Sequence, residues 1–503
     1  MGAGATKAET TVEHVDVLIV GAGLSGIGAA CQLRERFPER TLAILESRDA
    51  TGGTWDLFRY PGVRSDSDMF TLGYRFRPWR DPKVLADGTS ILEYVRETAR
   101  EYGVDELVRL GQKVIAGNWS SDEQRWTVTI ELAGGEQRQM SCSFLHLCTG
   151  YYNYAHGYEP EFPGRERFGG TIVHPQHWPE DLDYQGRSVV VIGSGATAVT
   201  LVPALADSGA GHVTMLQRSP TYILSVPATD PVAKVALGRL PERAGQEIVR
   251  WKNIGVSVAL FQISQRAPRF VRGLIRRQNT AMLPDGYPVD THFKPRYGPW
   301  DERLCLVPDG DLFRAIRHGR ASVATGTIKT FTETGIELQS GEQLDADIIV
   351  TATGLELEVL GGAEFTVDGE PIDLPQTMGY KGAMLCGVPN AALVTGYTNA
   401  SWTLKADLVS GYVCRLLAYM DEHGYAVATP RAPGPGVEPE PFLDLKSGYV
   451  QRALDRLPKQ GSKAPWKLRQ NYPRDVYVLG YGPVDDEMEF AGARRPAPVA
   501  AAV

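Results

Sequence analysis

The chain has 503 residues, of which 43% are hydrophobic and 22% charged, and this length predicts two or three folded domains rather than one. Its 60 Asp and Glu residues exceed its 52 Lys and Arg residues, for a formal net charge of −8, which argues against a protein that binds the phosphate backbone of nucleic acid. The six cysteines include no C-x-x-C pair, so we expect no disulfide scaffold, no metal site and a cytoplasmic location.

The first predicted element is a buried parallel strand at residues 15–20, VDVLIV, which leads through Gly21, Gly23 and Gly26 into a helix. This order of strand, G-x-G-x-x-G and helix predicts a dinucleotide-binding Rossmann unit. Its first glycine permits a tight turn, its second lets a pyrophosphate lie against backbone, and its third lets helix and strand pack closely. The next strand, TLAILE, ends at Glu46, where a carboxylate can hydrogen-bond the ribose 2′-hydroxyl of FAD or NAD.

The pattern recurs at residues 187–207, where the strand RSVVVI precedes a second glycine loop and another helix. The strand after it, HVTMLQ, runs into Arg218, at the offset where the first unit has its carboxylate. An arginine there favours the 2′-phosphate of NADP(H), because a charge-assisted hydrogen bond contributes roughly 1.5–3 kcal/mol; the alternative is a solvated arginine at a strand end. The residues predicted to bind NADP are Gly193, Ser194, Gly195, Thr197, Ala198 (in place of the third glycine), Arg218 and Ser219.

Two further strands, at residues 144–150 and 347–354, end in Thr-Gly, where small residues let the chain cross close to a cofactor. We therefore predict an α/β fold with two Rossmann-like nucleotide-binding domains and a helical insertion. The predicted ranges are 1–150 and 371–503 for the FAD domain, 151–225 and 299–370 for the NADP domain, and 226–298 for the insertion.

Between the two units lies the motif F-x-G-x-x-x-H-x-x-x-W-P, formed by Phe168, Gly170, His174, Trp178 and Pro179. It resembles the fingerprint of the Baeyer–Villiger monooxygenases, the class B flavoprotein monooxygenases. Segments 52–76, 295–313 and 379–408 are similar to the same family, in particular to the branch typified by ethionamide monooxygenase. In that family the motif couples domain motion to cofactor use; from the residues alone, they could equally be a packed linker.

The resemblance implies a protein that uses NADPH, FAD and O2 to insert oxygen next to a ketone carbonyl, through a flavin C4a-peroxide. It assigns catalysis to Arg303, which stabilises an anion beside the flavin, and to Asp66, which steers that arginine; without the resemblance each is a surface charge. It also implies that Gly53, Thr54 and Trp55 lie beside the flavin ring, where the alternative is a glycine turn before a core tryptophan.

One residue departs from the family pattern. Several relatives carry a lysine before the catalytic arginine, whereas this chain has Glu302. A carboxylate there would lower the affinity of the site for the 2′-phosphate. We therefore expect Arg218 to be the main source of the preference for NADPH over NADH.

Residues 226–290 are predicted to be helical, with five arginines between residues 266 and 277. We expect them to line the substrate entrance; docking on an anionic membrane is the alternative. No apolar run approaches the roughly 18 residues that cross a bilayer, so we expect neither a membrane span nor a signal peptide.

Two other functions are compatible with much of the same sequence. An N- or S-oxygenating flavin monooxygenase would act on a thioether or an amine, and Trp178 and Arg303 argue against it. A non-catalytic FAD- and NADP-binding redox sensor would need neither Arg303 nor Asp66. The expected partners are a small ketone or thioether and O2, with no nucleic acid, and the sequence indicates no oligomeric state.

Overall fold

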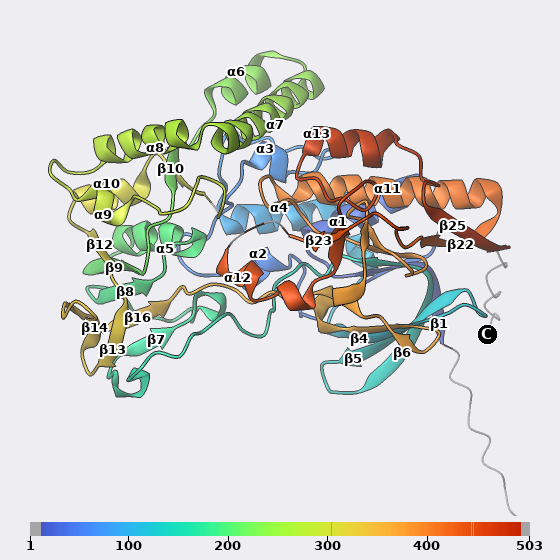
Figure 1. Cartoon of the computed structure of the whole chain (residues 1–503), viewed down its shortest axis with the longest axis horizontal. Helices are drawn as coiled ribbons and strands as arrows, with labels where there is room; N and C mark the ends of the chain where they lie inside the picture. Colours follow the sequence, from blue (N-terminus) through green and yellow to red (C-terminus); the bar gives the residue numbers. More distant parts are fainter. Residues whose placement is uncertain (1–11, 303, 444, 446, 494–503) are drawn as a thin grey trace, which may run out of the picture.

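The computed structural model describes residues 12–302, 304–443, 445 and 447–493. Two large sheets, one mixed and one parallel, lie at the right and the left of Figure 1. A separate group of helices runs along the upper edge of the molecule, formed by α6 (Pro231–Arg239), α7 (Glu242–Arg266) and α8 (Pro268–Met282).

The first sheet is built on β1 (Glu13–Val20), which pairs in parallel with β2 (Leu42–Leu45) and β6 (Gln137–Leu147). Alternate residues of a strand face opposite sides of the sheet. Val17 and Ile19 accordingly pack in one core with the covering helices, and Leu18 packs in another with antiparallel strands. Both faces of β1 are therefore buried, which explains its unbroken apolar run. The other strands are β3 (Val108–Arg109), β4 (Gln112–Ser120), β5 (Arg125–Leu132), β17 (Glu364–Val367), β18 (Glu370–Pro371), β19 (Gly379–Tyr380), β20 (Met384–Leu385) and β21 (Ala391–Leu393).

Three helices cover one face of this sheet: α1 (Leu24–Arg36), α4 (Gly88–Glu101) and α11 (Trp402–His423). The first begins directly after the glycine loop, as the sequence predicts. On the opposite side, the antiparallel part of the same sheet contributes Trp119 of β4 and Trp126 of β5, which are almost completely buried in one core with Leu18. The first nucleotide fold thus has helices on one side of its parallel strands and antiparallel strands on the other.

The second sheet repeats this plan with different residues. It has the order β12 (Ala321–Thr325), β9 (His212–Gln217), β8 (Ser188–Ile192), β16 (Ile348–Thr351) and β7 (Thr171–Val173), with every pair parallel. One face packs on α5 (Ala196–Asp207) and α10 (Asp311–Arg317). The other packs on the small sheet of β13 (Ile328–Thr332), β14 (Gly335–Leu338) and β15 (Gln343–Asp345). The predicted α/β class with two Rossmann-like folds is confirmed.

The chain returns to the first sheet earlier than residue 371. Strand β17 pairs in parallel with β4, and β18 completes a hairpin with β17. These strands lie mostly within the range 299–370 that the sequence analysis assigned to the NADP domain. The difference arises because β17 is short and half-polar, so its sequence carries little sign of which sheet it joins.

The helices α6, α7 and α8 are followed by α9 (Val289–His292), and the group lies between β10 (Ile223–Val226) and β11 (Cys305–Pro308), which pair in parallel. Asp230 caps α6, since its carboxylate accepts hydrogen bonds from the N–H groups of Val232 and Ala233. Pro268 occupies the first turn of α8 and separates that helix from α7.

Shorter elements complete the chain. The helices among them are α2 (Thr54–Leu57), α3 (Met69–Leu72), α12 (Gly448–Gln451), α13 (Tyr472–Asp475) and the π-helical turn η7 (Val476–Tyr481). The strands are β22 (Tyr425–Pro430), β23 (Pro439–Pro441), β24 (Lys459–Gly461) and β25 (Met488–Ala493). Across the described ranges, no helix is both long enough and apolar enough to cross a membrane.

Candidate functional site: two nucleotide cradles on one cleft

The first glycine loop is held too tightly for side chains. Gly21 has φ of +104°, and a Cβ built on it would lie 2.6 Å from the carbonyl oxygen of Cys148. A Cβ on Gly26 would lie 1.8 Å from the carbonyl oxygen of Gly21, so α1 packs directly on the loop. A Cβ on Gly23 would face Gly53 at 3.5 Å. The loop therefore needs glycine both for its turn and for its close packing.

Glu46 follows β2 and points back to this loop. It is 4% exposed, and its Oε2 accepts a hydrogen bond of 2.8 Å from the N–H of Ala22. Its Oε1 accepts another of 3.0 Å from the N–H of Arg48. The predicted carboxylate is thus held in place by backbone donors beside the glycine loop.

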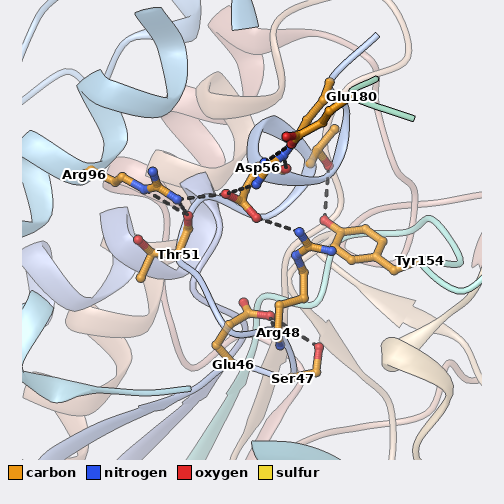
Figure 2. A network of polar contacts seen from close by, with 10 residues as sticks. Glu46, Ser47, Arg48, Thr51, Asp56, Arg96, Tyr154 and Glu180 are labelled. Carbon is orange, nitrogen blue, oxygen red and sulfur yellow. Dashed lines mark hydrogen bonds and ion pairs between the residues drawn. The ribbon is translucent and has the colours of Figure 1, made fainter. Parts of the chain in front are cut away.

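A second buried carboxylate, Asp56, stands beside this cradle. It is 2% exposed and lies between Arg48, at 2.5 Å, and Arg96, at 2.8 Å (Figure 2). Arg96 also donates to the carbonyl oxygen of Thr51 at 3.0 Å. This network fixes the turn that carries Gly53, Thr54 and Trp55. Sequence reasoning missed Asp56, although it directly follows that predicted segment.

One cleft of about 470 Å³ brings the two nucleotide folds together. Its walls include Asp66 and the start of α5, so residues of both folds face one space. Of the residues predicted from the sequence, the walls contain Gly21, Gly23, Glu46, Gly53, Thr54, Trp55, Asp66 and Thr197. Seven other residues that were predicted to bind cofactor do not line the cleft: Gly26, Gly193, Ser194, Gly195, Ala198, Arg218 and Ser219.

Aromatic side chains that the sequence analysis did not single out also line the cleft. Tyr151 and Trp402 stack with ring centroids 4.8 Å apart, and the Trp402 ring N–H donates to Ser25 at 2.7 Å. Tyr154 donates to or accepts from Thr54 at 3.2 Å, and burial raises its pKa to about 12. The segment 379–408, which resembles the family, contains Trp402 and could have indicated it.

The second glycine loop has the same pattern in more open surroundings. Gly193 has φ of +137°, and a Cβ there would lie 2.3 Å from the carbonyl oxygen of Ala352. Around a Cβ on Gly195, by contrast, no atom of the described residues lies within 4 Å. Arg218 and Ser219, which follow β9, are exposed. The predicted NADP residues thus surround an accessible loop rather than an enclosed one.

Glu302 lies close enough to Arg218 for their charges to interact. Its carboxyl pKa is raised, mainly by burial and then by the neighbouring Asp301, while Arg218 lowers it. The departure from the family pattern therefore falls beside the predicted phosphate-binding arginine. Arg303 lies outside the described residues.

The F-x-G-x-x-x-H-x-x-x-W-P motif lies along the edge of the second sheet. A Cβ on Gly170 would come within 2.3 Å of the carbonyl oxygen of Asp347, and Phe168 packs edge-on against Phe331. The ring of His174 packs against Gly157, where a Cβ would lie 2.1 Å from Cε1 of that ring. Burial lowers the pKa of His174. Trp178, followed by the exposed Pro179, packs against the second core.

The motif contacts the segments that connect the two folds. Residues 151–158 and 353–358 run side by side, with hydrogen bonds that include Asn153 N–H to the Glu356 carbonyl at 2.8 Å. Gln176, inside the motif, donates to the carbonyl oxygen of Asn153 at 2.8 Å. Just after the motif, Glu180 pairs with Arg59 of the first fold at 2.7 Å (Figure 2). The motif is therefore attached to both the paired connection and the neighbouring fold.

No group of three or more His, Cys, Asp or Glu side chains that could hold a metal ion occurs in the part of the chain that the structure describes. All six cysteines are buried free thiols.

Comparisons with known proteins agree with this geometry. Sequence models described as "Flavin-binding monooxygenase-like" and "NAD(P)-binding Rossmann-like domain" match residues 78–233 and 19–81. The FAD-containing monooxygenase EthA of Mycobacterium tuberculosis is 58% identical over 488 residues, which cover 97% of this chain and 99% of EthA. The probable FAD-binding monooxygenase AlmA of Acinetobacter baylyi is 49% identical over 475 residues, covering 94% and 95%.

Solved structures share the fold at lower identity. Cyclohexanone monooxygenase from Rhodococcus sp. Phi1 bound to NADP+ has a TM-score of 0.72 at 20% identity, covering 96% of this chain and all of that one. Oxidized steroid monooxygenase bound to NADP has a TM-score of 0.73 at 21% identity, covering 95% and 99%. The resemblance predicted from the sequence is confirmed, and the chain belongs to the family of FAD-containing, flavin-binding monooxygenases.

Proposed function

We propose that the protein is a Baeyer–Villiger monooxygenase. In the proposed reaction a ketone, O2, NADPH and a proton give an ester or lactone, NADP+ and water. The observation that carries the proposal is the common cleft, which brings the first glycine loop, Asp66 and the start of α5 to one space. Electrons could pass there from one nucleotide to the other beside a bound substrate.

The first cradle fits FAD. Its glycines leave backbone bare for a pyrophosphate, and α1 turns its N-terminus to that point, where unpaired N–H groups favour negative charge. The buried carboxylate of Glu46 suits the ribose hydroxyls. Gly53, Thr54 and Trp55 would then lie along the flavin ring. When bound and reduced, FAD supplies the activation of O2.

The second cradle fits NADPH. Its loop precedes α5, and the exposed Arg218 and Ser219 offer donors for a 2′-phosphate. Glu302, beside Arg218, would oppose that phosphate and leave the arginine as the main source of cofactor choice.

Arg303 and Asp66 are the proposed catalytic pair. The role of Arg303 comes from its sequence segment: an always-charged guanidinium would stabilise negative charge on oxygen during attack on the carbonyl. Asp66, an exposed carboxylate on the cleft wall, would orient that cation.

A small apolar cavity of about 50 Å³ adjoins the cleft and suits an uncharged substrate. It shares Tyr151, Tyr397 and Trp402 with the cleft, and its other walls include Leu357 and Phe442. Such walls would hold the hydrocarbon part of a ketone and exclude water from the reacting atoms.

The motif residues Phe168, Gly170, His174, Trp178 and Pro179 would transmit movement between the folds, because the motif is attached to the paired connection. We place the reaction in the cytoplasm, since six unpaired cysteines suit a reducing compartment.

The test is to incubate the purified protein with NADPH, ¹⁸O2 and a panel of linear, cyclic and aryl ketones plus a thioether. We expect one labelled oxygen in an ester or lactone and matching consumption of NADPH. Labelled sulfoxide without any ester would establish the N- and S-oxygenating alternative, and the absence of labelled product from every substrate would contradict both. Asp66→Ala should keep FAD while losing most ester formation.

A further inference from the structure

The helices α6, α7 and α8 carry nine exposed apolar side chains, which together we name the apolar face. Single exposed apolar residues are common on proteins, but a cluster marks an interaction surface. The members of the apolar face are 42% to 61% exposed: Val232, Val235, Leu240, Ile248, Trp251, Val256, Ile263, Phe270 and Leu274.

The apolar face follows the helix periodicity. Ile248, Val256 and Ile263 are spaced by about two turns, so they lie along one side of α7 over roughly 22 Å. Phe270 and Leu274, one turn apart, lie on one side of α8. The three helices form the upper edge of the molecule in Figure 1, away from both sheets.

The same helices are strongly basic in an acidic protein. Residues 231–282 contain ten Lys and Arg but only two Asp and Glu, whereas the whole chain has a net charge of −8. Three of these cations make contacts within the protein. Arg250 donates to the carbonyl oxygens of Phe70 and Gly73. Lys252 pairs with Asp230, and Arg276 pairs with Asp290. Six are exposed and have no ion pair among the described residues: Lys234, Arg239, Arg243, Arg266, Arg269 and Arg277.

A groove of about 190 Å³ lies beside α8 and gathers cationic side chains. Arg269, Arg272, Arg276 and Lys294 line it. Arg272 is held by hydrogen bonds to the hydroxyl of Tyr222 at 3.0 Å and the carbonyl of Tyr297 at 3.2 Å. Arg276 and Lys294 pair with Asp290, so Arg269 and Arg272 are the donors that a phosphate group would meet in this groove.

We propose that α6, α7 and α8 dock on a membrane surface rich in anionic phospholipid. The helices lie in the plane of the interface, with the apolar face among the upper acyl chains and the arginines at the headgroup phosphates. A second copy of the chain is the less suitable occupant, because a symmetric pairing would bring two sets of six exposed cations together.

Docking would place the cleft near the bilayer. Ile254 of α7 packs in one cluster with Tyr397, and Tyr397 lines both the cleft and the apolar cavity. An apolar ketone dissolved in the membrane would thus have a short path to the site. This consequence rests on the proposed function, whereas the docking does not.

The test is co-sedimentation of the intact yellow protein with vesicles of phosphatidylcholine alone or with 30 mol% phosphatidylglycerol. We expect binding only to the second kind, weakening as salt rises. The triple variant Arg266→Gln, Arg269→Gln and Arg277→Gln should bind about 100-fold more weakly, since each arginine near such a surface contributes severalfold. Phe270→Ser with Leu274→Ser should also weaken binding, by about tenfold or more.

A matched control neutralises three exposed cations elsewhere, with Arg187→Gln, Arg431→Gln and Lys463→Gln, and should bind like the wild type. Failure of the wild type to bind anionic vesicles at low salt overturns the proposal, as does equal loss in the control. If Phe270→Ser with Leu274→Ser instead turns a dimer into a monomer in sedimentation velocity and leaves vesicle binding intact, a second copy covers the face. NADPH oxidation in solution, without vesicles, should be unchanged in all variants, which separates this test from that of the reaction.

Discussion

The two glycine loops share a sequence pattern but differ in their surroundings. The first is enclosed: Gly23 faces Gly53 at 3.5 Å, and Glu46 is 4% exposed. The second is open, with free space around Gly195 among the described residues and with Arg218 exposed. One backbone motif can therefore serve two kinds of binding, and the elements packed over it decide which.

The difference in enclosure between the two loops fits the different roles of FAD and NADPH in the proposed reaction. FAD stays bound through many turnovers, so an enclosed cradle that buries most of it is suitable. NADPH must bind and NADP+ must leave in every cycle, so an open cradle allows exchange. Substitutions of glycines in the two loops test this comparison.

The largest effect is expected from Gly21→Ala. The new Cβ would lie 2.6 Å from the Cys148 carbonyl at a backbone φ of +104°, which strains any side chain. We expect a colourless protein, measured as the ratio of absorbance at about 450 nm to that of the polypeptide, with circular dichroism to verify folding.

Gly195→Ala, at the position equivalent to Gly23, is the substitution in the open loop. No described atom lies within 4 Å of its Cβ, so the protein should keep its fold and its FAD and lose only affinity for NADPH, where the methyl group would meet the pyrophosphate. Wild-type FAD content in Gly21→Ala, or loss of FAD in Gly195→Ala, would contradict the comparison.

The next effect concerns the pH dependence of stability in the first sheet. His146 in β6 is fully buried, and burial lowers its pKa from 6.5 to about 4. Below pH 6.5 the His146 imidazole is protonated in the unfolded chain but stays neutral in the native state. The free energy of unfolding therefore falls as the pH drops from 6.5 towards 4, by about 3 kcal/mol at most. His146→Leu should remove this part of the loss.

Denaturant unfolding at pH 7.5, 6 and 4.5 measures the free energy of unfolding of the wild type and of His146→Leu. The stability of the variant relative to the wild type should increase as the pH falls. His212 supplies the control from the second sheet. It is only partly buried and shares a hydrogen bond of 2.8 Å with Ser322. A His212→Leu variant with the same pH trend would show that the effect is not specific to the enclosed fold.

Sequence alone predicted the parts of the fold that follow from local patterns. The two strand, glycine loop and helix units could be predicted because their periodicity and glycine spacing are contained within about 25 residues. The return of the chain to the first sheet at β17 could not be predicted in this way, because the pairing of β17 with β4 joins segments more than 240 residues apart. Of the arginines that pair with Asp56, Arg48 and Arg59 are close in sequence, whereas Arg96 comes from 40 residues away.

The candidate site shows the same division. Gly21, Glu46 and Asp66 were predicted and lie on the cleft. Tyr151 and Trp402 were not, because they stack across a gap of 251 residues. The exposure of the second loop depends on which elements pack over it, and this cannot be predicted from the local sequence pattern.

A smaller effect is expected from Arg218→Ala. Losing a charge-assisted hydrogen bond to the 2′-phosphate should raise the KM for NADPH at least tenfold. The KM for NADH, which lacks that phosphate, should stay within about twofold, and the FAD content should not change, because Arg218 is remote from the enclosed cradle. Steady-state kinetics with both cofactors measure this; an unchanged KM for NADPH would remove Arg218 from the phosphate site.

The smallest effect is expected from Glu302→Gln, which removes a negative charge beside Arg218 without changing the side chain's shape. The partly buried carboxylate opposes a 2′-phosphate in the open cradle, and a charge interaction near the surface is worth about 1 kcal/mol. The KM for NADPH should therefore fall up to about fivefold, and the change should shrink as salt rises. Burial raises the pKa of Glu302. The decrease in the KM for NADPH should therefore be largest above that pKa, where the wild-type carboxyl is charged, and should disappear as the pH falls below it. A decrease in KM for NADH of the same size would mean that Glu302 acts on the shared part of the two nucleotides and not on the phosphate.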